Sequence, residues 1–453
     1  MWTMIGTLEC VVDELAPAFT QPSYGSAAEL LLGWIMCLGR HTLRRVGQTA
    51  HPEVVPDHSQ RHGLDSSYNF FARSAWTPGA LAYRVALLVF TRLKLLGTIT
   101  LLVDDTLAHK RGKSVWGLGW FRDACASTKK RVATAPGHNW VVLAVAVCLP
   151  GTGVPILALP LCARLHRPGK GQPSCPELAK EMLAEVLQWF PGKRFTLVGD
   201  GAYASKTLLA DLDERVRFVG RLRGDAALYD PRVPVAKPGK PGRKARKGPK
   251  LPKPKEAAAK ADRKRLQAGP WQWQAVAVVV YGCVRCLKAV AYEALWPTVL
   301  GQRTARIVVV RDPSGRMRDC YLFTTDLSAS DAWVITQFAW RWSIEVLFRA
   351  SKQVMDLEAP QHFCQQSVEK LAPWVWSMQS VIMVWYVTAG HTLPEAQELR
   401  SLMGAWDSEW SLRHMVQVLR RATLNATIKP RSAEPNELLE LIETLKNCVN
   451  LAA

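Results

Sequence analysis

Acidic residues follow two short apolar segments of the chain, and a third acid lies in a segment with helical spacing. The segment Thr98–Val103 runs into Asp104, and Phe195–Gly199 runs into Asp200. The third acid is Glu345. Carboxylate oxygens are the ligands that hard divalent cations such as Mg²⁺ prefer. A fold that brought these acids together would therefore create a metal site.

The segment Ser330–Met355 is expected to form one long helix with a charged stripe. Phe338, Arg341 and Lys352 lie at offsets −7, −4 and +7 from Glu345. At roughly 100° per residue, these offsets return close to one face of a helix. The carboxylate would then be flanked by two cations. A surface Arg–Glu pair that stabilises an ordinary helix by about 0.2–0.5 kcal/mol explains the same stripe equally well.

The elements that must position these acids alternate between strand and helix patterns. Strand patterns occur at 98–103, 140–149, 154–161, 195–199 and 216–220, and helical patterns occur at 176–190 and 206–213. The order is three strands, helix, strand, helix, strand. This order predicts an α/β fold with a ribonuclease-H-like mixed sheet, in which one acid ends the first strand and another follows the fourth.

The regions around this core differ in composition. Residues 1–96 read as a helical unit with a polar loop at 51–67, and residues 97–222 form the first part of the core. Residues 223–329 read as an insertion that combines a flexible cationic tether, 237–265, with a β-rich unit. Residues 330–370 complete the core with the helix of Glu345, and 371–453 are helical, with Pro373, Pro394 and Pro435 as expected breaks.

The helical N-terminal unit carries basic residues that are available to phosphates, so it is a candidate for binding DNA ends. A solvated basic surface explains them about as well. They are Arg44, Arg45, Arg73, Arg84, Arg92 and Lys94.

Composition points to a polyanionic partner. The 453 residues are 48% hydrophobic and carry a formal net charge of +20. Nucleic acid suits this charge better than a membrane surface, since neither end has a basic amphipathic helix, although a charge that only serves solubility is the alternative. The apolar stretch Val141–Ala163 is interrupted by a Pro-Gly turn, which predicts two strands rather than a membrane span.

The cysteines predict a reducing environment. The N-terminus shows no secretory signal, and the eleven cysteines are scattered, so free thiols in the cytoplasm are expected. For Cys283 and Cys286, which have CxxC spacing, two buried thiols in a strand are favoured over a metal or redox site.

Three motifs together resemble those of bacterial insertion-sequence transposases that use an Asp-Asp-Glu triad. The segment WRWSIEVLFRASK resembles the Tyr-Arg-Glu-Lys signature of the insertion-sequence-four-like superfamily, whose core carries a β-rich insertion. Every spacing is intact, but Phe338 replaces the Tyr and removes one hydroxyl. LLVDDT resembles the first-acid motif with Asp104 as the ligand, and GDGAY resembles the second-acid motif, in which Tyr203 follows Asp200.

The resemblance implies roles for particular residues. Asp104, Asp200 and Glu345 would be the catalytic residues and would hold two Mg²⁺ ions, for which Mn²⁺ can substitute. Five cations would contact DNA phosphates, although a solvated loop explains Lys110, Arg111 and Lys113 almost equally well. Two tryptophan rings could stack on a base, although a role in the core is favoured for them. The cations are Lys110, Arg111, Lys113, Arg341 and Lys352, and the rings are those of Trp340 and Trp342.

The resemblance also implies a function, namely excision and reinsertion of a mobile element by metal-dependent DNA cleavage and strand transfer. The expected partners are double-stranded DNA, as terminal inverted repeats and as target, and a second copy of the chain in a synaptic dimer. A hairpin intermediate is characteristic of some relatives. The expected location is the bacterial cytoplasm, at the nucleoid. A domesticated or inactive DNA-binding protein with the same fold, or a nuclease that does not rejoin strands, are the alternatives.

Overall fold

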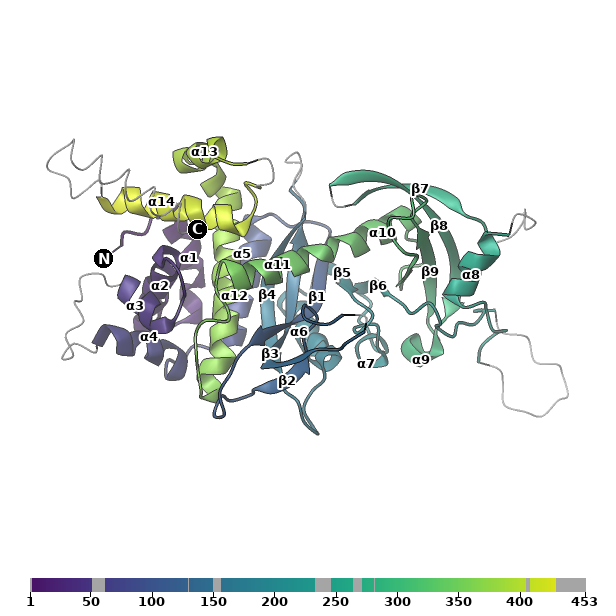
Figure 1. Ribbon diagram of the computed structural model, residues 1–453, viewed down its shortest axis with the longest axis horizontal. Coiled ribbons are helices and arrows are strands. Elements are labelled where there is room, and N and C mark those ends of the chain that lie inside the picture. The colour runs from purple at the N-terminus through teal and green to yellow at the C-terminus, as the bar shows by residue number, and fades with distance from the viewer. Residues whose placement is uncertain are drawn as a thin grey trace.

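A computed structural model describes residues 2–50, 62–128, 130–149, 156–232, 246–263, 271–280, 282–404 and 408–428. Its centre is a ten-stranded mixed sheet in the order β2-β3-β1-β5-β6-β10-β9-β8-β7, with β4 paired to β3 (Figure 1). The strands are β1 (Thr98–His109), β2 (Gly119–Arg122), β3 (Thr134–Val147), β4 (Leu157–His166), β5 (Arg194–Gly199), β6 (Val216–Arg221), β7 (Gln274–Val280), β8 (Cys283–Leu295), β9 (Thr304–Arg311) and β10 (Cys320–Thr324).

Helices flank this sheet and fill both ends of the chain. They are α1 (Gly6–Val12), η1 (Asp13–Ala18), α2 (Gln21–Met36), α3 (Leu43–Ala50), α4 (His62–Ala72), α5 (Pro78–Arg92), α6 (Cys175–Trp189), α7 (Lys206–Leu209), α8 (Pro254–Ala261), α9 (Pro297–Leu300), α10 (Asp331–Trp340), α11 (Trp342–Gln353), α12 (Gln365–Thr388), η2 (Gly390–Thr392), α13 (Pro394–Ser401) and α14 (Leu412–Ile428).

Five strands of the core, β1, β3, β4, β5 and β6, have the order and directions of a ribonuclease-H-like sheet. β1 pairs antiparallel with β3 and parallel with β5, β3 pairs antiparallel with β4, and β5 pairs parallel with β6. Leu101, Leu102 and Val103 of β1 are fully buried. A continuous apolar run of this kind suits a central strand that is covered on both faces. The predicted mixed α/β fold is therefore confirmed.

The β-rich insertion extends the core sheet. β10 pairs antiparallel with β6, with Leu322 opposite Arg221, and β9, β8 and β7 follow in antiparallel order. Without β10, the backbone groups along one side of β6 would lie at an open sheet edge. Pairing satisfies them, so the insertion and the core share one sheet (Figure 1).

The two faces of the core sheet are covered by different helices. The side chain of Asn139 in β3 contacts Cys175 at the start of α6. The neighbouring Trp140, which points to the opposite face, packs edge-on against Trp376 of α12 at 5.7 Å between ring centroids. Since alternate strand residues point to opposite faces, α6 covers one face, and α12 covers the other.

The structure corrects four expectations. The tether was expected to bury almost nothing, but α8 forms within it and buries Pro254, Ala257 and Ala258; residues 233–245 and 264–270 lie outside the described residues. Pro373 does not interrupt α12, most of whose residues are buried, so tertiary packing outweighs the roughly 3 kcal/mol cost of an internal proline. The expected loop at 51–67 overlaps α4, which begins at His62, and residues 51–61 lie outside the described residues. Cys283 and Cys286 lie in a strand, as expected, but are exposed rather than buried.

Other predictions agree in outline. The N-terminal region is helical, and the strand pair at 140–161 appears as β3 and β4, although the Pro-Gly turn between them and Pro435 lie outside the described residues. Within the described part of the chain, no helix is long and apolar enough to cross a membrane.

Candidate active site

The first two acids of the motif analysis lie side by side across two parallel strands. The register of β1 and β5 pairs Val103 with Gly199, so Asp104 and Asp200 are the next residues along the two strands. Paired residues of neighbouring strands point to the same face of a sheet. The two carboxylates therefore lie on one face, where the negative charge of Asp200 acts on Asp104.

Arg341 links the third acid, Glu345, to Asp104 by hydrogen bonds. Arg341 donates through Nη1 to Oδ2 of Asp104 at 2.7 Å and through Nη2 to Oε1 of Glu345 at 2.6 Å. The side chains of Arg341 and Asp104 are 18% and 16% exposed, whereas that of Glu345 is 33% exposed. The helix thus presents Arg341 and Glu345 on one stripe, as its spacing predicted, and the stripe faces the strand-end acid.

The expected long helix is broken at Arg341, which ends α10 and precedes α11. Around this residue the backbone bonds tighten, because Arg341 donates to the carbonyl of Phe338 and Ile344 donates to that of Arg341, three residues back in each case. Ser343 also donates from its hydroxyl to the carbonyl of Trp340 at 2.8 Å. A side chain that takes a carbonyl out of the helical ladder is a common cause of such a break.

Burial makes Asp104 hard to ionise. Desolvation raises its pKa to about 7, and the charges of Asp200 and Asp105 act in the same direction, while the Arg341 guanidinium opposes them. A buried carboxylate beside like charges favours a nearby cation. In this structure the cation is Arg341.

Asp105 points to the opposite face and has other partners. It accepts a hydrogen bond from Nδ2 of Asn139 at 3.1 Å and another from the hydroxyl of the fully buried Tyr203 at 3.1 Å. Burial raises the pKa of Asp105, and these two donors partly counteract the effect. The motif resemblance assigns the ligand role to Asp104 and leaves open whether Asp105 shares it; in the structure, Asp104 shares its face with Asp200 and contacts Arg341.

The acids do not converge on an empty cation site in this arrangement. Among the described residues, no group of three or more His, Cys, Asp or Glu side chains is placed so that it could hold a metal ion. Arg341 bridges Asp104 and Glu345 instead. The donor set nevertheless consists of carboxylate oxygens, which suit a hard divalent cation.

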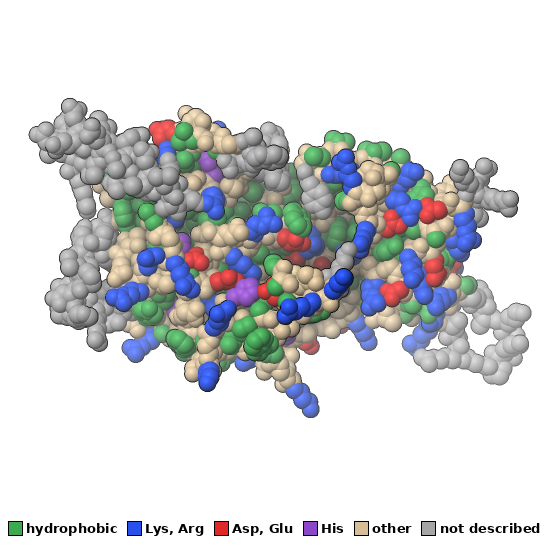
Figure 2. Space-filling model, in the orientation of Figure 1, with side chains coloured by type: hydrophobic (Ala, Val, Ile, Leu, Met, Phe, Trp, Pro, Cys, Tyr) green, Lys and Arg blue, Asp and Glu red, His purple; other side chains and the backbone are tan. Residues whose placement is uncertain are grey.

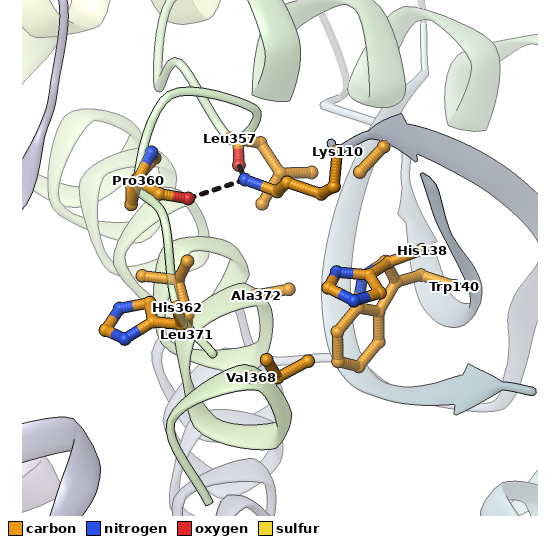
Figure 3. Close-up of a pocket in the computed structure, with 10 residues that line it drawn as sticks. Lys110, His138, Trp140, Leu357, Pro360, His362, Val368, Leu371 and Ala372 are labelled. Atoms are coloured by element: carbon orange, nitrogen blue, oxygen red, sulfur yellow. Dashed lines mark hydrogen bonds between the residues drawn. The ribbon is translucent and has the colours of Figure 1, made fainter. Parts of the chain in front are cut away.

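Lys110, a predicted phosphate ligand, is buried and bonded to backbone carbonyls. It is 6% exposed, and its ammonium donates to the carbonyls of Leu357, Glu358 and Pro360 at 3.3, 2.9 and 2.7 Å. Figure 3 shows the bonds to Leu357 and Pro360. Burial lowers its pKa to about 8. Lys110 therefore anchors the segment after α11 to the end of β1, and this anchor helps to position the helix of Glu345.

Two further contacts hold the same segment. His109 lies between two carboxylates, with Nδ1 2.9 Å from Oε1 of Glu358 and Nε2 2.9 Å from Oδ2 of Asp123. Hydrogen bonds to both carboxylates raise its pKa against the opposing effect of desolvation. Asp356 accepts the backbone N–H of His41 at 2.8 Å. These anchors have no local sequence signal, because their partners lie far apart along the chain.

The remaining candidates differ in how open they are. Lys352 donates to the carbonyl of Leu107 at 2.6 Å and is 25% exposed, so it joins α11 to β1 and keeps part of its surface free. Arg111 and Lys113 are exposed. Trp342 is 44% exposed, whereas Trp340 is half-buried, so the core role favoured for the pair does not fit Trp342.

The basic residues of the N-terminal unit also differ in their contacts and exposure. Arg84 donates to the carbonyl of Glu14, and Arg92 forms an ion pair with the carboxylate of the same residue. Arg44, Arg45 and Arg73 are exposed. Arg84 and Arg92 thus serve the packing of α5 on η1.

Comparison with known proteins gives a family match and likenesses to solved structures. A family model described as a DDE superfamily endonuclease matches residues 14–279, a range that includes Asp104 and Asp200 and ends before Glu345. No curated protein matches the chain significantly. A solved piggyBac transposase synaptic complex with hairpin DNA aligns with 98% of this chain and 81% of that chain, at 10% identity and a TM-score of 0.41.

Proposed function

This chain belongs to the DDE superfamily of endonucleases, and from that premise we propose that it is a DNA transposase. It would cut DNA at the ends of its own mobile element and join the freed ends to target DNA. The observation that carries the proposal is the shared face of Asp104 and Asp200, with Glu345 linked to Asp104 through Arg341. Two strand-end acids and one helix acid, which are far apart in sequence, thus all interact electrostatically with Arg341.

Asp104, Asp200 and Glu345 would hold two divalent ions, Mg²⁺ or Mn²⁺. When bound, such ions activate the attacking water and stabilise charge on the leaving oxygen. Arg341 would have to release at least one carboxylate for the acids to act as ligands. Its planar guanidinium would then be free to hold two oxygens of a DNA phosphate beside the cut.

Other side chains would bind and orient the DNA. Lys352 would place a point charge near the same phosphate from the end of α11. Arg111 and Lys113 would contact the backbone from the exposed loop after β1. Trp342, which is exposed next to Arg341, is the better placed of the two tryptophans to stack on a base.

The finer assignment rests on the motifs quoted above. The Tyr-Arg-Glu-Lys spacing and the β-rich insertion support a bacterial insertion-sequence transposase, which acts on terminal inverted repeats in a synaptic dimer. The net charge of +20 supports a DNA partner. A hairpin at the excised end belongs to the same proposal, and open, unjoined ends in a cleavage reaction would count against it.

The test is cleavage of a DNA fragment that carries the ends flanking the gene, in the presence of Mg²⁺ or Mn²⁺. The wild type is compared with Glu345→Gln, which keeps the shape of the side chain and removes its charge. Glu181→Gln, a change of an exposed acid on α6, is the matched control. We expect metal-dependent cuts at the element boundary that vanish in Glu345→Gln and persist in Glu181→Gln.

Other outcomes favour the alternatives. Tight, salt-sensitive DNA binding without cutting by any of the three proteins would favour a domesticated DNA-binding protein. Metal-dependent cutting without joined products, even with a supplied target duplex, would favour a nuclease.

A further inference from the structure

A second cluster of cations lies beside Asp200, outside the triad and its helix. It lines an open cleft of about 570 Å³ between the end of β6, the start of α8 and β10. Three cations, one carboxylate and two aromatic rings contribute to its wall, and Gly201 and Ala204 connect it to the segment after Asp200. The charged and aromatic lining residues are Arg221, Arg223, Asp225, Lys255, Trp296 and Tyr321.

Arg221 continues the row of acids across the sheet. The register of β5 and β6 pairs Gly199 with Gly220, so Asp200 and Arg221 are the next residues along these strands. Asp104, Asp200 and Arg221 therefore lie next to one another at the same end of three neighbouring strands. Arg221 flanks Asp200 on the side away from Asp104.

The charge of Arg221 is not balanced by an ion pair. It is exposed, and no acidic side chain among the described residues forms a salt bridge with it. Arg223 differs, because it makes two hydrogen bonds of 2.9 Å to the carboxylate of Asp225, the acid of the cleft. Lys255 is exposed and lies near enough to Asp225 to affect its pKa. The lining thus keeps an excess of two positive charges.

Backbone hydrogen bonds fix the walls of this cleft. The amide of Leu222 donates to the carbonyl of Tyr321 at 3.0 Å, and the amide of Lys255 donates to that of Gly224 at 3.1 Å. A Cβ at Gly224 would lie 2.6 Å from the ring of Tyr321, so a larger residue there would displace the ring or the turn. Figure 2 shows Lys and Arg side chains over the part of the molecule that holds α8 and β8, intermixed with Asp and Glu. An unbalanced cation in a built cleft beside Asp200 is the feature that sets this cluster apart.

We propose that this cleft binds one backbone phosphate of the DNA strand that is cut, namely the neighbour of the scissile phosphate. Arg221 and Lys255 would be its ligands. The proposal rests on the proposed function, because it places the cut at the acids of the same row. The strand would cross the row with its scissile phosphate near Asp104, Asp200 and Glu345 and the neighbouring phosphate over β6. Arg221 is thus a positioning residue that fixes where the strand lies relative to the acids.

The experiment measures DNA binding as a function of salt. The probe is a fluorescein-labelled duplex that carries the DNA flanking the gene, titrated by anisotropy over a series of KCl concentrations. Each phosphate contact contributes roughly 0.9 to the slope of log K against log salt. We expect Arg221→Gln to lower this slope by about 0.9 and to weaken binding roughly tenfold at moderate salt. Lys255→Gln should act in the same direction.

Arg194→Gln is the matched control. Arg194 is also an exposed arginine at a strand end, but it begins β5 and lies at the edge of the sheet opposite to the acids. The slope of log K against log salt for Arg194→Gln should equal that of the wild type. A second probe series replaces single phosphates near the cut by neutral methylphosphonates. One position should weaken wild-type binding and have no further effect in Arg221→Gln.

The outcomes separate the two proposals. If the wild type binds and cuts but Arg221→Gln and Lys255→Gln keep the wild-type slope, the cleft proposal is overturned and the transposase proposal stands. If the wild type neither binds nor cuts this DNA, both fall. If Arg221→Gln is misfolded by circular dichroism, Lys255→Gln and the methylphosphonate series on the wild type decide: an unchanged slope and no sensitive position reject the cleft.

Discussion

Replacing Lys110 with methionine tests whether this lysine is an anchor or a DNA contact. The ammonium holds three backbone carbonyls after α11. A buried carbonyl that loses its donor costs about 1–3 kcal/mol, so three of them amount to about 6 kcal/mol. Against this, the pKa of Lys110 falls from 10.5 to about 8 on burial. At 1.36 kcal/mol per pKa unit, the variant avoids a desolvation cost of about 3 kcal/mol. The net loss of stability is therefore about 3 kcal/mol.

The loss should concentrate in the segment that Lys110 holds. The amides of Leu357 and Ala359 donate to the carbonyls of Ser351 and Asp356 and report on this segment. Because every 1.4 kcal/mol is a factor of ten, their protection from hydrogen exchange should fall roughly 100-fold in Lys110→Met. Lys113→Met, a change of an exposed lysine three residues further on, should leave this protection intact.

DNA binding gives the opposite pattern. Lys110→Met should keep the salt dependence of DNA binding, since a buried ammonium with three acceptors neutralises no phosphate. Lys113→Met should make it shallower if Lys113 contacts the backbone. The reasoning is refuted if Lys110→Met retains full amide protection and shows a reduced salt slope, because Lys110 would then act as a phosphate ligand.

Two other predictions concern the contribution of buried polar side chains to stability. Tyr203→Phe removes the hydroxyl that donates to Asp105 and should lower the free energy of unfolding in urea by about 1.5–3 kcal/mol. Tyr68→Phe, at an exposed tyrosine, is the control and should have little effect. Equal urea midpoints for the two variants would contradict this prediction. Burial lowers the pKa values of His138 and His362 to about 4, so the unfolded chain binds more protons between pH 6.5 and 4. Stability should be fully present above pH 6.5 and fall toward pH 4, and His362→Phe should flatten this dependence, which a pH series of urea midpoints measures.

Much of the core could be predicted from local sequence patterns. The apolar runs before Asp104 and Asp200 predicted the strands β1 and β5, because a central strand covered on both faces is apolar throughout. The Arg341–Glu345 spacing predicted a shared helical face, because helix geometry fixes which residues share a face. The order of strands and helices then predicted a ribonuclease-H-like core.

Other features depend on partners distant in the chain. Lys110 reads as a loop cation, but its acceptors lie about 250 positions away, and only the packing of the segment after α11 buries it. The break at Arg341 depends on the side chain of Ser343, and the continuity of α12 through Pro373 depends on burial between the sheet and the N-terminal helices. No local pattern records such contacts.

The sequence by itself determined which acids occur, at which strand ends, and on which helical face, because strand and helix periodicities are properties of neighbouring residues. Tertiary structure alone decided that Asp104 faces Arg341 and Asp105 faces Tyr203, and that the insertion extends the core sheet beside Asp200. Adjacent strand residues point to opposite faces, so the choice between two neighbouring aspartates depends on the register between strands. That register is set by long-range backbone pairing and by burial of one face against helices from elsewhere in the chain.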